Sequence, residues 1–251
     1  MKTIEKIIKT KTLYGIITIL IIWHVFHITV ESNVIPSPYE TVRRFIVLFP
    51  NTLSMHLLAS LGRIMLAIGI SIILGVPLGL WIGMNKKADS IISPVIYILY
   101  PLPKIAFLPI FMILLGIGNT AKVTLIVTII IFQILIGVRD GVKEIPRELY
   151  YSAVSLGVSG AGIYRHLIMP AVLPRLFSAL RLSLGISIST LFFAENFATT
   201  YGIGYYIMNA WTMVDYLDMF AGILSLSLLG LLLLRSLDMA ERKICPWMFL
   251  K

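Results

Sequence analysis

Six long apolar stretches constrain what this chain can fold into more than any other feature of the sequence. They cover residues 13–30, 56–84, 91–115, 121–138, 172–193 and 217–234. A helix of about 20 mostly apolar residues crosses the hydrocarbon core of a bilayer. Hydrophobic residues make up 58% of the chain and charged residues 13%, whereas a soluble domain is about 45–50% apolar and about 25% charged. The sequence therefore predicts an all-α membrane protein with six transmembrane helices.

The first apolar stretch follows four lysines and so imitates the start of a secretory signal peptide. The residues around its end, HITVESNVIPSP, contain no small-x-small pattern of the kind at which signal peptides are cleaved. We therefore expect this stretch to be a retained first transmembrane helix.

The basic residues gather at alternate ends of the apolar stretches, which sets an expected orientation. One side of the membrane receives the basic N-terminal segment, Lys86 and Lys87, the polar segment 139–170 and the C-terminal tail. Because lysine and arginine accumulate in cytoplasmic loops, we expect a multi-pass protein of the plasma or inner cell membrane with both termini in the cytoplasm. The net charge is +9, but its dispersal argues against a nucleic-acid partner.

The polar segment 139–170 reads RDGVKEIPRELYYSAVSLGVSGAGIYRHLIMP and is far longer than a simple connection between packed helices. Pro146 suits the start of a helix and Gly157 suits a left-handed helix end. The sequence therefore predicts a short cytoplasmic helix, about Glu148 to Leu156, that docks onto another protein. The alternative is a helix that lies on the lipid headgroups with its tyrosines in the aromatic belt.

The third apolar stretch is broken by four prolines between residues 94 and 109, and Lys104 lies among them. Within a membrane such breaks persist where protein or water satisfies the freed backbone groups, and they often mark a translocation path. We expect Lys104 to line a path and to attract an anion. The alternative is that Glu195 or a backbone carbonyl neutralises the lysine.

Other ionisable residues in or beside the apolar stretches are costly in lipid unless they face protein or water. We expect Arg181 and Glu195 along the path, although for Arg181 a tie between helices is the favoured alternative. Arg63 lies near the outer end of the second stretch, where its side chain is expected to extend to the membrane surface. Pro77, in the same stretch, is expected to be an ordinary proline of a membrane helix.

The sequence lacks the motifs of several enzyme and metal-site classes. It contains no GxxxxGK[ST] phosphate-binding loop, no HExxH and no GxSxG. Cys245 is the only cysteine, and His24 and His27 have no acidic or cysteine neighbour on their stretch. We therefore expect no catalytic residue, no metal site and no cofactor bound by this chain.

The end of the polar segment carries a recognisable pattern. Permease subunits of ATP-binding-cassette (ABC) importers have a cytoplasmic loop of the form E-A-A-x3-G-x9-I-x-L-P, and this chain resembles it. The matching positions are Tyr151, Ser152, Ala153, Gly157, Leu167, Met169 and Pro170. The spacing agrees with the pattern. Glutamate is missing at position 151, and Glu148 lies one helical turn earlier, so any salt bridge carried by that glutamate is in doubt.

Nearly the whole chain is similar to the nitrate/sulfonate/bicarbonate/taurine-type subfamily of these permeases. The segments that carry the likeness are VIPSPYETV (34–42), HLLASLGRIMLAIGISIILGVPLGLWIGM (56–84), PLPKIAFLPIFMILLGIGNTAK (101–122), LPRLFSALRLSLGISIS (173–189) and AENFATTYGIGYYIM (194–208). The resemblance implies a type I ABC importer permease fold with a cytoplasmic coupling helix. It also implies a core over 52–238, preceded by a segment 1–51 with the first helix and followed by a tail 239–251.

The resemblance further implies a pathway formed by two copies of the chain. Two cytoplasmic ATPase subunits would bind ATP and magnesium, and a solute-binding protein would dock outside. The residues that it assigns to ATPase coupling are Glu148, Tyr150, Tyr151, Ser152, Ala153, Leu156, Gly157 and Pro170. The solute would be a small anion, such as a sulfonate, nitrate or bicarbonate, or a small vitamin precursor. The alternatives are an ion-coupled secondary transporter, for which Glu195 is the sole intramembrane carboxylate candidate, and a membrane-embedded enzyme.

Overall fold

The computed structural model describes residues 2–30, 32 and 34–249, with the backbone alone for residues 2–13. The described residues form helices and connecting segments without a β-strand, as the composition predicts. The helices are α1 (Lys2–Val30), α2 (Pro38–Leu48), α3 (Ser54–Met84), α4 (Lys86–Leu99), α5 (Leu108–Leu115), α6 (Asn119–Lys143), α7 (Arg147–Ser155), α8 (Ala161–Ile163), α9 (Met169–Glu195), α10 (Ile203–Thr212) and α11 (Tyr216–Ile244).

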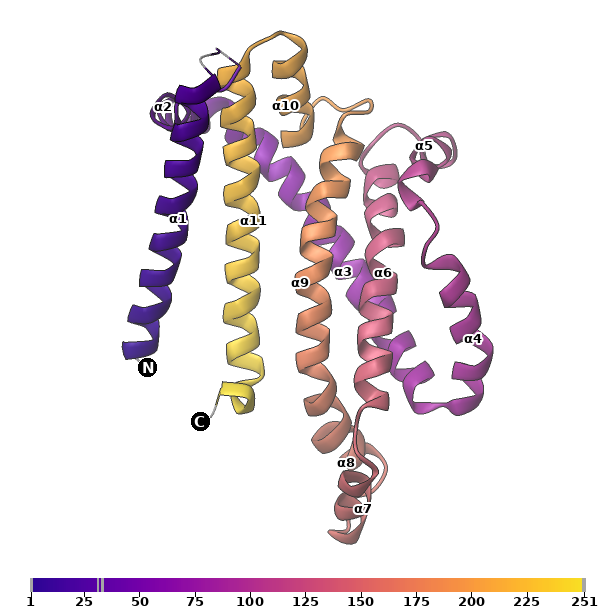
Figure 1. Cartoon of the computed structure of the whole chain (residues 1–251). Coiled ribbons are helices and arrows are strands. Elements are labelled where there is room, and N and C mark those ends of the chain that lie inside the picture. Colours follow the sequence, from indigo (N-terminus) through magenta and orange to yellow (C-terminus); the bar gives the residue numbers. More distant parts are fainter. Residues whose placement is uncertain (1, 31, 33, 250–251) are drawn as a thin grey trace.

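The long helices stand roughly side by side, and the short ones lie at the two ends of the bundle (Figure 1). Helix α3 crosses obliquely behind α9 and α6, while α1 and α4 lie at opposite edges. Helices α7 and α8 project beyond the end at which both chain termini lie, and α2, α5 and α10 lie at the other end (Figure 1). The predicted docking helix is therefore on the same side as both ends of the chain.

Among the described residues, four helical segments are long and apolar enough to cross a membrane. These are Pro38–Met84, Asn119–Lys143, Ala161–Glu195 and Tyr216–Ile244. The pair Lys86–Leu99 and Lys104–Leu115 qualifies as a fifth span only if it is counted as one span bent by 81°. The described apolar part of α1, Tyr14–Val30, is shorter than these. The part of the chain that the structure describes thus shows four to five spans by length and composition, where the sequence predicts six.

The break in the third stretch is confirmed, but only some of its prolines cause it. Helix α4 continues through Pro94 and ends at Leu99, and Pro109 lies in the first turn of α5. The chain changes direction at Pro101–Pro103, where two residues without an N–H follow each other closely. Pro77 lies inside an uninterrupted α3, as expected for an ordinary proline of a membrane helix.

Small residues let α3 approach α6 closely enough for their backbones to touch. A methyl group added at Gly79 would lie 2.7 Å from the carbonyl oxygen of Leu135, and one at Gly83 would lie 2.9 Å from that of Arg139. Small residues at every fourth position are the usual means of close helix packing in membranes. Gly137 continues the pattern on the other side of α6, where its added methyl would lie 2.8 Å from Ala179 of α9. Helices α3, α6 and α9 therefore form the packed centre of the bundle.

Candidate functional site

Helix α7 has the start and the end that the sequence predicts. Pro146 precedes it with an extended backbone, and Glu148 lies in its first turn, where a carboxylate suits the helix dipole. At the other end, Gly157 adopts the left-handed conformation with φ of +79°. The N–H of Val158 donates to the carbonyl of Ala153 at 3.0 Å, which closes a Schellman-type end. The short helix and the role of Gly157 in ending it are confirmed.

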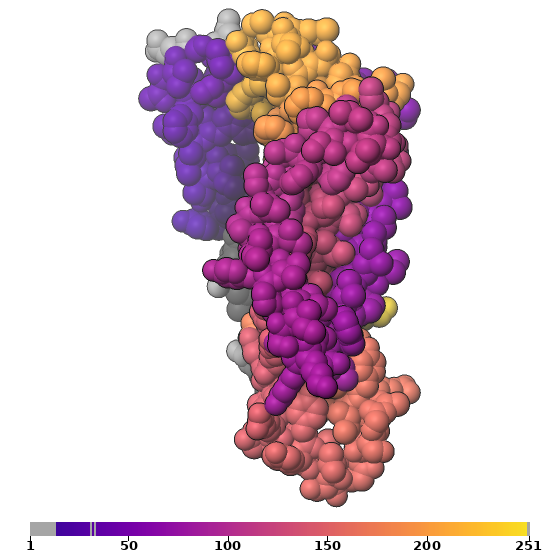
Figure 2. Space-filling view, turned by 90° about the vertical axis from the view of Figure 1, so that its right-hand side faces the viewer, coloured from indigo at the N-terminus to yellow at the C-terminus, as the bar shows by residue number. Residues whose placement is uncertain are grey.

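Helix α7 and its C-cap carry four large apolar side chains that no other part of the structure covers. Leu156, the C-cap, is 82% exposed and Tyr151 is 67% exposed, and Leu149 and Val154 are also exposed. Helix α7 has no buried residue. Exposed apolar clusters of this kind usually mark a surface that binds another protein or a membrane. Figure 2 shows the same part of the chain projecting beyond the bottom of the bundle.

The two adjacent tyrosines of α7 face different surroundings. Tyr150 packs against the apolar cluster formed by Val142, Ile145 and Ile168, and this burial raises the pKa of its hydroxyl. Tyr151 points into solvent. Tyr150 therefore anchors α7 to its own chain. This differs from the expectation that both tyrosines contact the ATPase. The hydroxyl of Ser152, which is exposed, donates to the carbonyl of Glu148 one turn earlier in the same helix at 2.8 Å.

The base of the polar segment is held by the core of the bundle. Ile168 is 2% exposed and packs with Val138 of α6 and Val172 of α9. Pro170 lies in the first turn of α9, where its missing N–H leaves no helix hydrogen bond unmade. Across the base, Arg175 of α9 pairs with Glu144. The base of the polar segment is therefore packed against both α6 and α9.

Lys104 lies in the short 3-10 turn Lys104–Phe107 between α4 and α5. Its ammonium donates to the carbonyl of Tyr100 at 2.8 Å and lies 4.8 Å from the centre of the Phe132 ring. Of the two partners considered from the sequence, the backbone carbonyl is the one observed, and Glu195 is not. Gln133 of α6 donates to the hydroxyl of the same Tyr100 at 2.8 Å. A cation, an amide and a phenol thus lie together at the break.

Arg181 ties α9 to α11 at the end of the bundle that carries the chain termini. Its guanidinium contacts Asp238 at 2.9 Å and Glu241 at 2.7 Å. Both acceptors belong to α11, so the favoured alternative from the sequence, a tie between helices, is observed.

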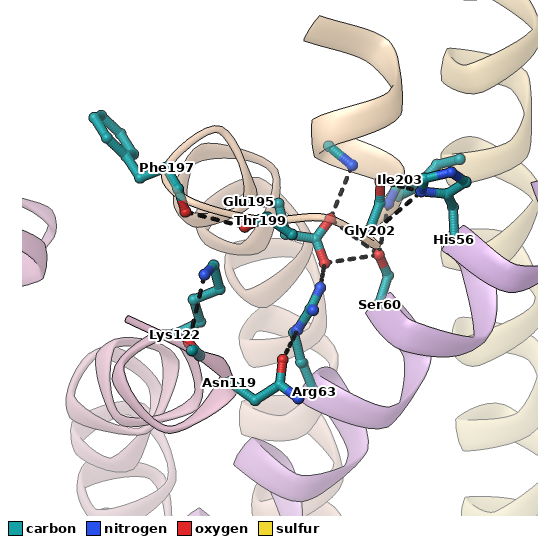
Figure 3. A network of polar contacts seen from close by, with 12 residues as sticks. His56, Ser60, Arg63, Asn119, Lys122, Glu195, Phe197, Thr199, Gly202 and Ile203 are labelled. Carbon is teal, nitrogen blue, oxygen red and sulfur yellow. Dashed lines mark hydrogen bonds and ion pairs between the residues drawn. The ribbon is translucent and has the colours of Figure 1, made fainter. Parts of the chain in front are cut away.

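Glu195, at the last turn of α9, is fully buried in a network of polar contacts (Figure 3). Its carboxylate pairs with the guanidinium of Arg63 from α3. It also accepts hydrogen bonds from the hydroxyl of Ser60 at 2.8 Å and from the N–H of Gly204, in α10, at 2.8 Å. The expectation that Arg63 reaches the membrane surface is wrong, because the arginine is 7% exposed and its charge is satisfied inside the protein.

The network continues on both sides of this ion pair (Figure 3). Arg63 donates from Nε to the side-chain oxygen of Asn119, at the start of α6, at 2.8 Å. His56 Nδ1 lies 3.0 Å from both the nitrogen and the oxygen of Gly202. The ammonium of Lys122 contacts the carbonyl of Ala198 at 3.2 Å. Four helices, α3, α6, α9 and α10, are thereby joined at the end of the bundle opposite α7.

Sequence reasoning missed most of this network. Ser60, Asn119 and Lys122 were not singled out as partners, and Arg63 was given no partner. A signal was nevertheless present. Arg63, Lys122 and Glu195 lie in or beside three different apolar stretches, and each lies at the end that is expected on the outer side of the membrane. Charges at one depth in a membrane protein pair with one another when they face inward. The described residues contain no cluster of histidine, cysteine, aspartate or glutamate that could hold a metal ion.

The sequence of the chain is similar to those of known transport proteins. Residues 75–245 match the family described as binding-protein-dependent transport system inner membrane component. The chain is 32% identical to the taurine transport system permease protein TauC of Escherichia coli K12, over 85% of this chain and 80% of TauC. It is 27% identical to the formylaminopyrimidine transport permease protein ThiX of Halalkalibacterium halodurans, over 91% of this chain and 92% of ThiX.

A solved structure supports the fold. The methionine ABC transporter MetNI in an inward-facing conformation contains a chain that superimposes with a TM-score of 0.63 at 20% identity. The superposition covers 76% of this chain and 95% of that chain. At this identity the likeness establishes the fold of the bundle alone.

Proposed function

The chain belongs to the family of binding-protein-dependent transport system inner membrane components, and we propose that two copies of it form the solute pathway of an ABC importer. It is a multi-pass permease subunit and not itself an ATPase. In this proposal the core spans 52–238, α1 is the first of six spans, and α4 with α5 is the bent third. Both termini and α7 lie in the cytoplasm, which suits their common side of the bundle (Figure 1).

The observation that carries the proposal is the set of exposed apolar side chains on α7, in a segment whose base packs against the core of the bundle. In the proposed complex α7 inserts into a groove of the ATPase subunit. The solvent-facing side chains Tyr151, Val154 and Leu156 make the contact, while Tyr150 holds α7 to the apolar cluster beneath it and Pro170 starts α9. ATP-driven closure of two ATPases then moves the two α7 helices together and turns the pathway outward, and hydrolysis resets it.

The position of the bent span supports the proposal of a second copy. The break between α4 and α5 is at the edge of the bundle away from α1 and α11 (Figure 1). The face formed by α4 and α5 carries highly exposed apolar residues, among them Tyr97 at 82% and Ile113 at 83% (Figure 2). In a single copy the ammonium of Lys104 would lie beside lipid, which is costly. A second copy packed on this face would enclose Lys104 in a shared path.

Within this proposal the three path residues of the sequence analysis take different roles. Lys104 lines the path and favours an anionic solute. Arg181 and Glu195 have their charges satisfied by neighbouring helices, so they hold the walls of the path in place. The solute class is a small anion, such as a sulfonate, nitrate or bicarbonate, or a vitamin precursor of the formylaminopyrimidine kind.

Replacing Tyr151 tests the docking role of α7. The chain is co-expressed with candidate ATPase and solute-binding subunits from the same genome, and the complex is purified from membranes. We expect Tyr151→Ala to reduce ATPase retention and solute-stimulated ATP hydrolysis at least tenfold, since central aromatic contacts carry about 2 kcal/mol or more of binding energy. Tyr39→Ala, at a tyrosine that is 76% exposed on α2 at the opposite end, is the matched control and should leave ATPase retention unchanged.

Retention of the ATPase by Tyr151→Ala at the wild-type level would contradict the docking role. The solute is then sought with the binding protein, by titrating it with taurine, an alkanesulfonate, nitrate, bicarbonate and formylaminopyrimidine. Uptake of a solute without ATP hydrolysis would favour the alternative function, an ion-coupled secondary transporter.

A further inference from the structure

Lys122 is a buried charge without a carboxylate of its own. Its side chain belongs to α6 and is 1% exposed. The ammonium has two backbone carbonyls within hydrogen-bond reach, those of Ala198 at 3.2 Å and Gly118 at 3.4 Å. The nearest carboxylate, Glu195, is already held by Arg63, a hydroxyl and a backbone N–H (Figure 3). The network around Glu195 therefore contains two basic side chains for one acid.

Fold stability does not explain a lysine at this position. Burying an ammonium is costly, and two long hydrogen bonds to carbonyls offset only part of that cost. Replacing buried charges with apolar side chains of similar volume is often neutral or stabilising. The lysine is therefore better understood from what its ammonium holds in place.

The atom that it holds belongs to a residue in an unfavourable conformation. Ala198 has φ of +44°, in the left-handed region, and among the described residues Val214 is the other non-glycine residue with positive φ. An L-residue with a Cβ is disfavoured there, whereas glycine is not. Without an added contact, Ala198 would gain by relaxing to negative φ, and the hydrogen bond from Lys122 supplies such a contact.

Ala198 lies in the segment 196–202 that joins α9 to α10, which we call the outer segment. The other end of the segment is closely packed as well. A methyl group added at Gly202 would lie only 2.4 Å from the carboxyl carbon of Glu195, so the backbone of Gly202 lies directly against this side chain. Between these two contacts the segment presents Tyr201, which is 53% exposed, and next to Ala198 it presents Phe197, which is 47% exposed. Lys122 thus contacts the segment that carries these two exposed aromatic rings.

The same helix reaches the opposite end of the molecule. Helix α6 carries Lys122 in its first turns and ends at Lys143, directly before the segment that leads into α7. Helix α6 thus connects the outer segment, through Lys122, to the segment that leads into the proposed ATPase contact.

We infer that Lys122 is a positioning residue that holds Ala198 in its left-handed conformation and so keeps the outer segment in the shape that the solute-binding protein contacts. This inference rests on the proposed function. It also assigns to α6 the coupling between the contact with the solute-binding protein and α7, the proposed coupling helix.

Two substitutions and their combination test the inference in the complete complex with ATPase and binding protein. Lys122→Met removes the ammonium and keeps the volume of the side chain. We expect its thermal midpoint to equal or exceed that of the wild type. The concentration of binding protein that gives half-maximal ATPase stimulation should rise about fivefold or more, which matches the typical penalty of a left-handed L-residue.

Glycine at position 198 should rescue the loss. Ala198→Gly alone is expected to leave half-maximal stimulation unchanged, because glycine adopts the left-handed conformation without the lysine. Combined with Lys122→Met, it should restore the half-maximal concentration to within about twofold of the wild type. Arg43→Met removes one exposed positive charge from the same side of the protein, and it controls for a general loss of attraction to the binding protein.

Three results would overturn the inference. An unchanged half-maximal concentration in Lys122→Met would mean that the ammonium positions nothing. A loss with a lowered thermal midpoint and no rescue by Ala198→Gly would mean that Lys122 supports the fold alone. An equal loss in Arg43→Met would assign the effect to long-range charge. A wild-type complex that no binding protein stimulates would instead contradict the proposed function.

Discussion

Replacing Arg63 with methionine should strongly destabilise the protein, because it leaves the carboxylate of Glu195 buried without its cation. Glu195 is 0% exposed and Arg63 is 7% exposed, so water cannot take over the role of the arginine. Removing one partner from a buried ion pair costs about 3–5 kcal/mol. For a chain of this size each kcal/mol lowers the thermal midpoint by about 2–4 °C, so we expect a fall of about 6–20 °C.

The charge itself, and not the packing of the arginine, should account for most of this loss. Glu195→Gln in the Arg63→Met background removes the uncompensated charge but keeps an oxygen at the position of Oε2, which accepts from both Ser60 and the N–H of Gly204. The double variant should therefore recover most of the midpoint. The difference between the double variant and the sum of the single variants gives the coupling energy of the pair.

Arg181→Met is the matched control for Arg63→Met, since it also breaks an arginine pair between two helices. Here the arginine is 40% exposed and its partners Asp238 and Glu241 are 43% and 15% exposed, so solvent reaches these ion pairs far more than it reaches Arg63 and Glu195. Exposed pairs contribute about 0–1 kcal/mol, which predicts a shift of at most about 4 °C. The assay is thermal unfolding of the purified complex in detergent, followed by size-exclusion chromatography. If Arg63→Met is no less stable than Arg181→Met, burial does not decide the contribution of these pairs.

Three further predictions concern packing, the path and the anchor of α7. Gly79→Ala places a methyl 2.7 Å from the carbonyl oxygen of Leu135 and should sharply reduce folded yield, whereas Gly69→Ala, with no atom within 4 Å of the added methyl, should not. Lys104→Gln should reduce uptake of an anionic solute about tenfold while leaving basal ATP hydrolysis intact, and Lys104→Arg should retain uptake; equal uptake in both variants would remove Lys104 from the path. Tyr150→Phe should preserve ATPase retention and Tyr150→Ala should reduce it, because the ring fills the cluster beneath α7.

The sequence by itself determined the features that depend on neighbouring residues. Apolar length predicted long helices that cross a membrane. The break at Pro101–Pro103 follows from missing N–H groups, and the end of α7 at Gly157 follows from a conformation that glycine readily adopts. The side on which α7 lies relative to the chain ends follows from the alternation of basic residues.

Only the tertiary structure decided which buried charges meet. Arg63 and Glu195 are 132 residues apart, and nothing in the local pattern of either stretch indicates that α3 and α9 bring them into contact. The inward direction of Tyr150 is likewise set by the cluster beneath it and not by its own helix, in which Tyr151 is an equivalent neighbour. A helix fixes the order of its side chains along the axis, but the helices packed around it determine which of them are buried.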